Sequence, residues 1–229
     1  MPAVADRHRR LAAARLYFVS DRRPGGRPLP EVLAAALAGG VDVFQLRDKT
    51  AGDDALLTAA AEARALCVAA GALFLLNDRP DLALAAEADG VHVGQADAPV
   101  AAARAAVGED RLVGLSTHGA AQADAAASLG PDYIAVGPVH PTPTKPGRPP
   151  IGLEPVRHAA RTVTIPWFAI GGIDPVTVHD VAAAGAGRAV VVRAIAEADD
   201  PEAAARDLRA ALERVPLPEA RPQVARGAA

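Results

Sequence analysis

A regular alternation of two kinds of segment constrains the fold of this 229-residue chain most strongly. Short runs rich in β-branched and aromatic residues alternate with longer alanine-rich runs that carry charges at helical spacing, almost from end to end. The first short run, at 15–20, reads RLYFVS, and the last, at 188–192, reads RAVVV. Such alternation is typical of βαβ units, which build parallel sheets covered by helices.

The predicted strands are 15–20, 41–46, 72–76, 90–93, 112–115, 132–136, 165–170 and 188–192. The predicted helices are 29–38, 54–70, 81–86, 100–107, 120–129, 153–162, 176–184 and 201–214. So many βα units within one ordinary domain length favour a single (β/α)8 TIM barrel, with an open doubly wound sheet as the alternative. We expect the barrel over residues 1–215 and a disordered tail over 216–229, where Pro and Ala show no apolar periodicity.

Composition narrows the class of function. The chain has 24 basic and 27 acidic residues, so its net charge of −3 gives no global positive field for nucleic acid or an anionic membrane. The longest uncharged apolar stretch, 65–76, is too short to cross a bilayer, and the amino-terminal segment lacks the pattern of a secretory signal. With a single cysteine, Cys67, no intrachain disulfide can form, and we expect a cytoplasmic protein.

The functional groups of such a barrel belong at the carboxyl ends of its strands. After the second predicted strand, Gln45, Arg47 and Lys49 alternate with Leu46 and Asp48, which puts an amide and two cations on one side of an extended chain. A guanidinium and an ammonium arranged in this way suit a phosphate or diphosphate. The alternative is a solvated strand end whose cations pair with nearby aspartates.

The third and fourth strands both end in an Asp-x-Pro sequence. Asp78 and Asp97 either cap the helices that follow, with Pro in the first turn, or converge at the barrel mouth to hold Mg²⁺. Magnesium sites usually combine one or two carboxylates with water and substrate phosphates. Arg47 and Lys49 on the neighbouring strand would bind the same diphosphate from its other side, so their presence favours the metal site over the helix caps.

Ser116 and His118 follow the fifth strand. No G-x-S-x-G elbow surrounds Ser116, so we interpret it as a hydrogen-bonding contact to substrate rather than a nucleophile. We expect His118 to cap the following helix and His92 and His140 to serve local packing, since no metal-ligand histidine spacing is present.

The loop over 137–152 is long for a connection within a barrel and is rich in hydroxyls and cations. Thr142, Thr144 and Lys145 are placed to close over an anionic ligand, and an ordinary proline-rich surface loop is the alternative. The seventh strand ends in Gly171-Gly172 and the eighth in Val192-Arg193. These two loops are the usual phosphate site of the barrel architecture, so they predict a second anion pocket.

Taken together, the motifs resemble the thiamine-phosphate synthase family over nearly the whole chain. They are QLRDK, NDRPDLA, GVHVGQADAP, GLSTH, YIAVGPVHPTPTK and AIGGI, in the family's order and approximate spacing. The resemblance implies a (β/α)8 barrel that joins 4-amino-5-hydroxymethyl-2-methylpyrimidine diphosphate to a thiazole phosphate, with Mg²⁺, and releases thiamine phosphate and pyrophosphate.

The resemblance also implies roles for individual residues. The pyrimidine diphosphate would be bound by Gln45, Leu46, Arg47, Asp48, Lys49, Asn77, Ser116 and Lys145, of which Arg47, Lys49 and Lys145 act on the leaving group. The metal would be held by Asp78 and Asp97. The thiazole phosphate would be bound by Thr142, Pro143, Thr144, Gly172, Val192 and Arg193.

Two positions depart from the family pattern, Asp48 where Glu is common and Arg193 where Ser is common. The expected partners are small-molecule substrates, and the oligomeric state stays open, with a homodimer as one option. Three other functions stay open too. They are a thiazole tautomerase-like isomerase, which would need a base such as His118, a non-catalytic phosphate-binding barrel, and a phosphate-handling barrel with other substrates.

Overall fold

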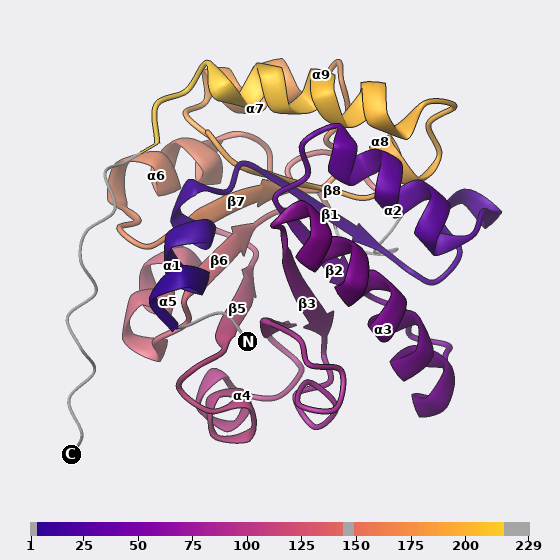
Figure 1. Ribbon diagram of the computed structural model, residues 1–229. Helices are drawn as coiled ribbons and strands as arrows, with labels where there is room; N and C mark the ends of the chain where they lie inside the picture. The colour runs from indigo at the N-terminus through magenta and orange to yellow at the C-terminus, as the bar shows by residue number, and fades with distance from the viewer. Residues whose placement is uncertain (1–3, 144–148, 218–229) are drawn as a thin grey trace.

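The eight strands of the computed structural model, which describes residues 4–143 and 149–217, are parallel and close into a barrel in chain order. They are β1 (Leu16–Ser20), β2 (Val43–Leu46), β3 (Leu73–Asn77), β4 (Gly90–Val93), β5 (Leu112–Thr117), β6 (Tyr133–Val136), β7 (Trp167–Ile170) and β8 (Ala189–Val191). Closure is direct, because β1 pairs with β8 as well as with β2 (Figure 1). The predicted (β/α)8 fold is therefore confirmed, and the open-sheet alternative is wrong.

The helices lie around the outside of this barrel (Figure 1). Those that match predicted ones are α2 (Leu29–Ala38), α3 (Asp53–Ala70), α4 (Val100–Val107), α5 (Ala120–Leu129), α6 (Glu154–Thr162), α7 (Val178–Ala183) and α9 (Pro201–Glu213). Three more were not predicted, namely α1 (Val4–Ala13), η1 (Pro24–Gly26) and α8 (Arg193–Ala196). No helix among the described residues has the length and apolar character needed to span a membrane. Residues 218–229 of the predicted tail lie outside the described residues.

The predicted helix at 81–86 is wrong, because this segment folds as a series of turns. Its backbone hydrogen bonds have mixed spacing, from Leu82 to Arg79, from Ala86 to Leu82 and from Ala88 to Ala83. Glu87 then has a φ of +47°, which turns the chain into β4. The reversal at Glu87 ends the segment before its turns can continue as a regular helix.

Two layers of apolar side chains form the core. The inner layer fills the barrel and includes Val43, Leu75 and Phe168, while the outer layer lies between strands and helices and includes Phe44 and Leu46. Buried alanines on the helices let them pack closely on the sheet, which accounts for a chain rich in alanine and poor in aromatic residues.

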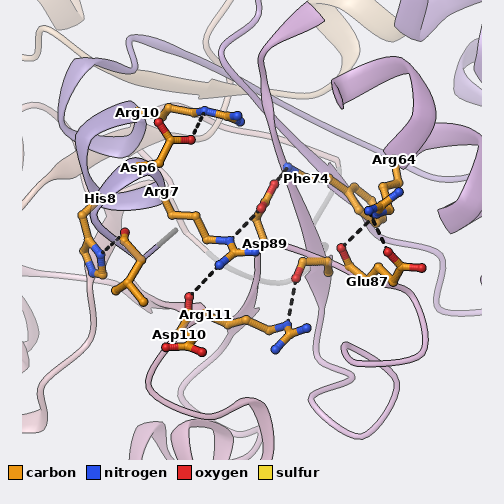
Figure 2. Close-up of polar contacts among 12 residues, drawn as sticks. Asp6, Arg7, His8, Arg10, Arg64, Phe74, Glu87, Asp89, Asp110 and Arg111 are labelled. Atoms are coloured by element: carbon orange, nitrogen blue, oxygen red, sulfur yellow. Dashed lines mark hydrogen bonds and ion pairs between the residues drawn. The ribbon is translucent and has the colours of Figure 1, made fainter. Parts of the chain in front are cut away.

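Helix α1 packs against the amino-terminal end of the barrel through polar contacts. The Arg7 side chain is only 2% exposed; its Nε donates to Asp89 Oδ1 at 2.8 Å and its Nη1 to the Asp110 carbonyl at 3.0 Å (Figure 2). His8 Nε2 lies 3.1 Å from Asp132 Oδ1, and Leu11 of the same helix packs into the inner layer. This end of the barrel is thus closed, which leaves the carboxyl end for ligands.

Candidate functional site

A cavity of about 170 Å³ lies at the carboxyl ends of β5 to β8. It is lined by Ser116, Thr117, His118, Ala135, Gly137, Pro138, Pro141, Thr142, Ile170, Gly171, Gly172, Ile173, Asp174, Val190, Val191, Val192, Arg193 and Ala194. This set contains five of the predicted site residues, namely Ser116, Thr142, Gly172, Val192 and Arg193. A cavity therefore lies between the loops after the seventh and eighth strands, where the sequence predicts a second anion pocket.

The loop after β7 exposes backbone donors to this cavity. Gly171 and Gly172 have φ values of +103° and +63°, and a Cβ on Gly172 would lie 2.7 Å from the Pro141 carbonyl oxygen. Only glycine fits here without strain. Among the described residues, the N–H groups of Gly172 and Ile173 have no hydrogen-bond acceptor. Free amide groups at such a turn suit an anion.

The loop after β8 adds to the same donor set. Helix α8 begins at Arg193, and the N–H groups of Arg193 and Ala194 likewise have no acceptor within the described residues. The Arg193 guanidinium is half-exposed and lies 3.7 Å from Glu197. It can therefore leave this weak ion pair for an anion in the cavity.

A second group of polar residues follows β2 and β3. Lys49 Nζ lies 3.1 Å from Asp78 Oδ2, so the structure brings together two residues that the sequence placed on different strands. Arg47 and Asn77 are half-buried, and their side chains make no hydrogen bond or ion pair to any residue in 4–143 or 149–217. The alternative of a strand end whose cations are all neutralised by nearby aspartates fails for Arg47.

Neither predicted metal ligand caps a helix. Asp97 Oδ2 accepts a hydrogen bond from the Gly94 N–H at 2.9 Å, and α4 begins after Pro99 without a side-chain cap. Asp78 precedes turns rather than a helix, and its φ of +57° is unusual for a residue other than glycine. The capping interpretation is therefore wrong for both. The other carboxylate oxygen of each is without a partner in the described parts of the chain.

Two of the predicted substrate-binding residues have other surroundings. The Leu46 side chain is fully buried between the strands and helices, so it faces away from the barrel interior, because strand residues alternate between the two faces. The Asp48 carboxylate accepts from Arg22 Nε at 2.7 Å and from Thr50 and Ala51. Partial burial opposes ionisation of Asp48, but these donors outweigh it and hold its pKa at about 2. Asp48 thus shapes the loop after β2.

The long loop after β6 is anchored at both ends. Ile151 donates to the Pro138 carbonyl at 2.8 Å, and Gly152 to the Val139 carbonyl at 3.1 Å. Thr142 lines the cavity, whereas Pro143 is exposed. The predicted contacts of Thr144 and Lys145 lie outside the described residues.

A buried polar chain below the cavity was not predicted. Gln45 Nε2 donates to Tyr17 Oη, which lies 3.0 Å from Tyr133 Oη. His92 joins this pair to Ser116, with Nδ1 3.0 Å from Tyr133 Oη and Nε2 2.9 Å from Ser116 Oγ. A sequence signal could have revealed Tyr17, Tyr133 and His92, because each is a polar side chain on the inward face of a short strand.

Two groups of polar residues therefore lie at the carboxyl end of the barrel, the cavity lined by the loops after β7 and β8 and the cations and carboxylates after β2, β3 and β4. The described residues contain no cluster of three or more His, Cys, Asp or Glu side chains able to hold a metal by themselves. These features define a (β/α)8 barrel with candidate anion sites at the carboxyl ends of its strands.

Comparison with known proteins identifies the family. Residues 16–195 match the family model described as thiamine monophosphate synthase, and the chain belongs to this family. It is 53% identical over 212 residues to a thiamine-phosphate synthase of Saccharopolyspora erythraea, which covers 89% of this chain and 95% of that protein. It is 49% identical over 209 residues to a thiamine-phosphate synthase of Nostoc punctiforme, covering 91% of this chain.

The chain spans only 59% of the Nostoc protein's length. Among solved structures, a thiamine phosphate pyrophosphorylase from Pyrococcus furiosus matches with a TM-score of 0.81 and 34% identity, over 90% of this chain and 98% of that one. The arrangement of the barrel is thus also similar to that of this solved structure.

Proposed function

We propose that this protein is a transferase that condenses 4-amino-5-hydroxymethyl-2-methylpyrimidine diphosphate with a thiazole phosphate, giving thiamine phosphate and pyrophosphate. The observation that carries the proposal is the presence of two separate anion-binding groups at one barrel end, in a chain about half identical to proteins named thiamine-phosphate synthase. The reaction joins two phosphorylated substrates, so it needs one such group for each.

The chemistry requires little beyond charge and position. The C–O bond between the pyrimidine methylene and the diphosphate breaks, and its electron pair leaves with pyrophosphate. The aminopyrimidine ring delocalises the resulting cation, and the lone pair of the thiazole nitrogen forms the new C–N bond. No proton transfer is needed for the balance, which agrees with a site built from donors and cations rather than a nucleophile and base.

Arg47 and Lys49 are proposed to bind the diphosphate. Arg47 is half-buried without a partner among the described residues, so its guanidinium is available for two phosphate oxygens. Lys49 already lies near Asp78, where it can contact both the carboxylate and the substrate. The half-buried position of Arg47 strengthens its interaction as negative charge develops on the leaving group.

The donor set also fits Mg²⁺. Asp78 and Asp97 each offer one carboxylate oxygen without a described partner, and a magnesium ion commonly takes only one or two protein carboxylates beside substrate phosphates. When bound, Mg²⁺ would supply positive charge that stabilises the departing pyrophosphate. Lys49 would then keep the Asp78 carboxylate oriented towards the diphosphate.

The thiazole phosphate is proposed to occupy the cavity between β5 and β8. The free N–H groups of Gly172 and Arg193 suit its phosphate, and the Arg193 guanidinium adds a charged contact where the family often has serine. Thr142, Pro143, Thr144 and Lys145 would border this site from the loop after β6. We further propose that the protein acts in the cytoplasm on small molecules, without nucleic acid or membrane.

A single assay tests the reaction. The purified protein is mixed with the pyrimidine diphosphate, the thiazole phosphate and Mg²⁺, and pyrophosphate and thiamine phosphate are measured with each component omitted in turn. We expect equal amounts of both products only in the complete mixture. Asp78→Asn and Asp97→Asn should each abolish the Mg²⁺-dependent turnover.

The same assay separates the other functions. Pyrophosphate release without the thiazole partner would indicate a hydrolase, and rearrangement of the thiazole without pyrophosphate would indicate the isomerase. Binding of both substrates with no product would indicate a non-catalytic barrel. Any of these three results would overturn the proposal.

A further inference from the structure

The chain of buried hydrogen bonds below the cavity has a direction. Gln45 lies at its inner end, and its amide Nε2 can only donate, so Tyr17 Oη must accept from it. The single Tyr17 proton is then free to be donated to Tyr133 Oη, 3.0 Å away. Because Gln45 donates to Tyr17, Tyr17 can in turn donate to Tyr133.

The second half of the chain can continue in the same direction. Tyr133 Oη would accept from Tyr17 and would donate its own proton to His92 Nδ1, 3.0 Å away. A neutral imidazole that accepts at Nδ1 carries its proton on Nε2. His92 Nε2–H then donates to Ser116 Oγ at 2.9 Å. The Ser116 hydroxyl has no other hydrogen bond to a described residue, and it lines the cavity.

Burial keeps both tyrosine hydroxyls protonated, so neither can lose its role as a donor. Burial raises the pKa of both Tyr17 and Tyr133 far above that of a free tyrosine, so both phenols keep their protons at every working pH. The five side chains are all buried, so water does not compete for these hydrogen bonds.

Packing holds the rings in place. The Tyr133 ring lies 6.0 Å from that of Tyr17, 5.7 Å from Phe168 and 5.5 Å from the His92 ring, between centroids. Gly114 leaves the space that the Tyr133 ring occupies, since a Cβ there would come within 2.1 Å of Tyr133 Cζ. The rings cannot rotate away without disturbing the inner core.

We propose that Gln45, Tyr17, Tyr133 and His92 form a one-way relay of hydrogen bonds that makes Ser116 a donor towards the cavity. The ligand atom next to Ser116 must then be an acceptor, such as an unprotonated ring nitrogen or a phosphate oxygen, and an N–H or O–H group at that place is disfavoured. His92 and Tyr133 are positioning residues, because they act through Ser116. The consequence for turnover rests on the proposed function, whereas the direction of the relay does not.

The direction is measured without any activity assay. Protein with ¹⁵N-labelled histidine rings is examined by NMR at pH 8, where the ring shifts distinguish the Nε2–H from the Nδ1–H tautomer. The His92 signals are those displaced in both Ser116→Ala and Tyr133→Phe. We expect the Nε2–H tautomer in the wild-type protein. The Nδ1–H tautomer would overturn the proposal, because Ser116 would then donate to His92 instead.

Two isosteric variants test the relay link by link. Tyr133→Phe removes the donor to His92 Nδ1, so the Nδ1–H tautomer should become populated, and Tyr17→Phe, one link further away, should have a smaller effect. An unchanged tautomer in folded Tyr133→Phe would contradict the proposal. In an active enzyme, Tyr133→Phe should lower kcat about tenfold, the equivalent of one hydrogen bond, with the KM of both substrates within about twofold. A wild-type protein without turnover would instead refute the proposed function and leave the tautomer result intact.

Discussion

The two ends of the barrel use charged side chains in opposite ways. At the amino-terminal end, Arg7 is buried against Asp89 and the Asp110 carbonyl (Figure 2), and Arg104 is paired with Asp132. At the carboxyl end, neither the Arg47 side chain nor the backbone amides of Gly172 and Arg193 have a partner within residues 4–143 and 149–217. Arginines paired with aspartates stabilise one end, and donors without a described partner leave binding capacity at the other. A (β/α)8 barrel separates stability from function in this way.

The largest expected effect comes from removing a cation of the carboxyl end. Arg47→Ala should lower kcat/KM about a thousandfold, as for the loss of a principal donor to a developing anion, and should leave the free energy of unfolding within about 0.5 kcal/mol. Steady-state pyrophosphate release and urea unfolding measure the two quantities. Arg9→Ala, at a side chain that is 79% exposed, is the control and should change neither. A loss of less than about fivefold for Arg47→Ala would contradict the proposed role.

The reverse pattern is expected at the amino-terminal end. Arg7→Met leaves Asp89 buried without its guanidinium partner and should lower the free energy of unfolding by about 3 kcal/mol. The kcat of the folded protein should stay unchanged, because α1 lies at the opposite end from the cavity. Urea unfolding compares it with Arg9→Met, for which about 0.5 kcal/mol or less is expected. A lower kcat with unaltered stability would show that the two ends are not independent.

A smaller effect is expected at the glycine turn of the cavity. Gly172→Ala forces a Cβ towards the Pro141 carbonyl at a φ of +63° and so displaces the free N–H groups. The KM for the thiazole phosphate should rise about tenfold, with little change in that for the pyrimidine diphosphate. Gly52→Ala, where an added Cβ meets nothing within 4 Å, should leave both constants unaltered. Equal changes in the two KM values would argue against separate anion sites.

The smallest effect is a dependence of stability on pH at the base of the barrel. The hydrogen bond to Asp132 raises the pKa of His8, and partial burial only partly opposes it. The stability from this pair is therefore full below the unfolded pKa of about 6.5 and is lost as the pH rises through the folded pKa. His8→Gln should cost about 1 kcal/mol at pH 5.5 and less at pH 9, as measured by urea unfolding. A cost that grows with pH would have the wrong sign.

Much of the fold could be predicted because its signals are local. The strands are short β-branched runs, and helices such as α2 and α5 begin and end at the predicted residues. Helix α1 was missed because Leu11 is its one buried apolar side chain. The other side chain that anchors it, Arg7, resembles any exposed arginine until Asp89 and Asp110 are placed beside it. The short α8 has only four residues and no periodicity to detect.

The positions of the candidate site residues could also be predicted from local signals, whereas their contacts with distant residues could not. Residues that follow the strands, such as Arg47, Asp78 and Gly172, could be assigned to the carboxyl end of the barrel once a barrel was expected. Sequence could not show that the Leu46 side chain faces the helices or that the Asp48 carboxylate is held by Arg22. It also could not reveal the relay to Ser116, because that relay exists only after five different strands close around one interior.

The most direct test is a crystal structure of the protein with Mg²⁺, pyrophosphate and the thiazole phosphate bound. We expect pyrophosphate between Arg47 and Lys49, with the metal on Asp78 and Asp97, and the thiazole phosphate on the amides of Gly172 and Arg193. Side chains 47, 49, 78 and 97 directed into separate regions, or a phosphate bound away from the cavity, would contradict the account.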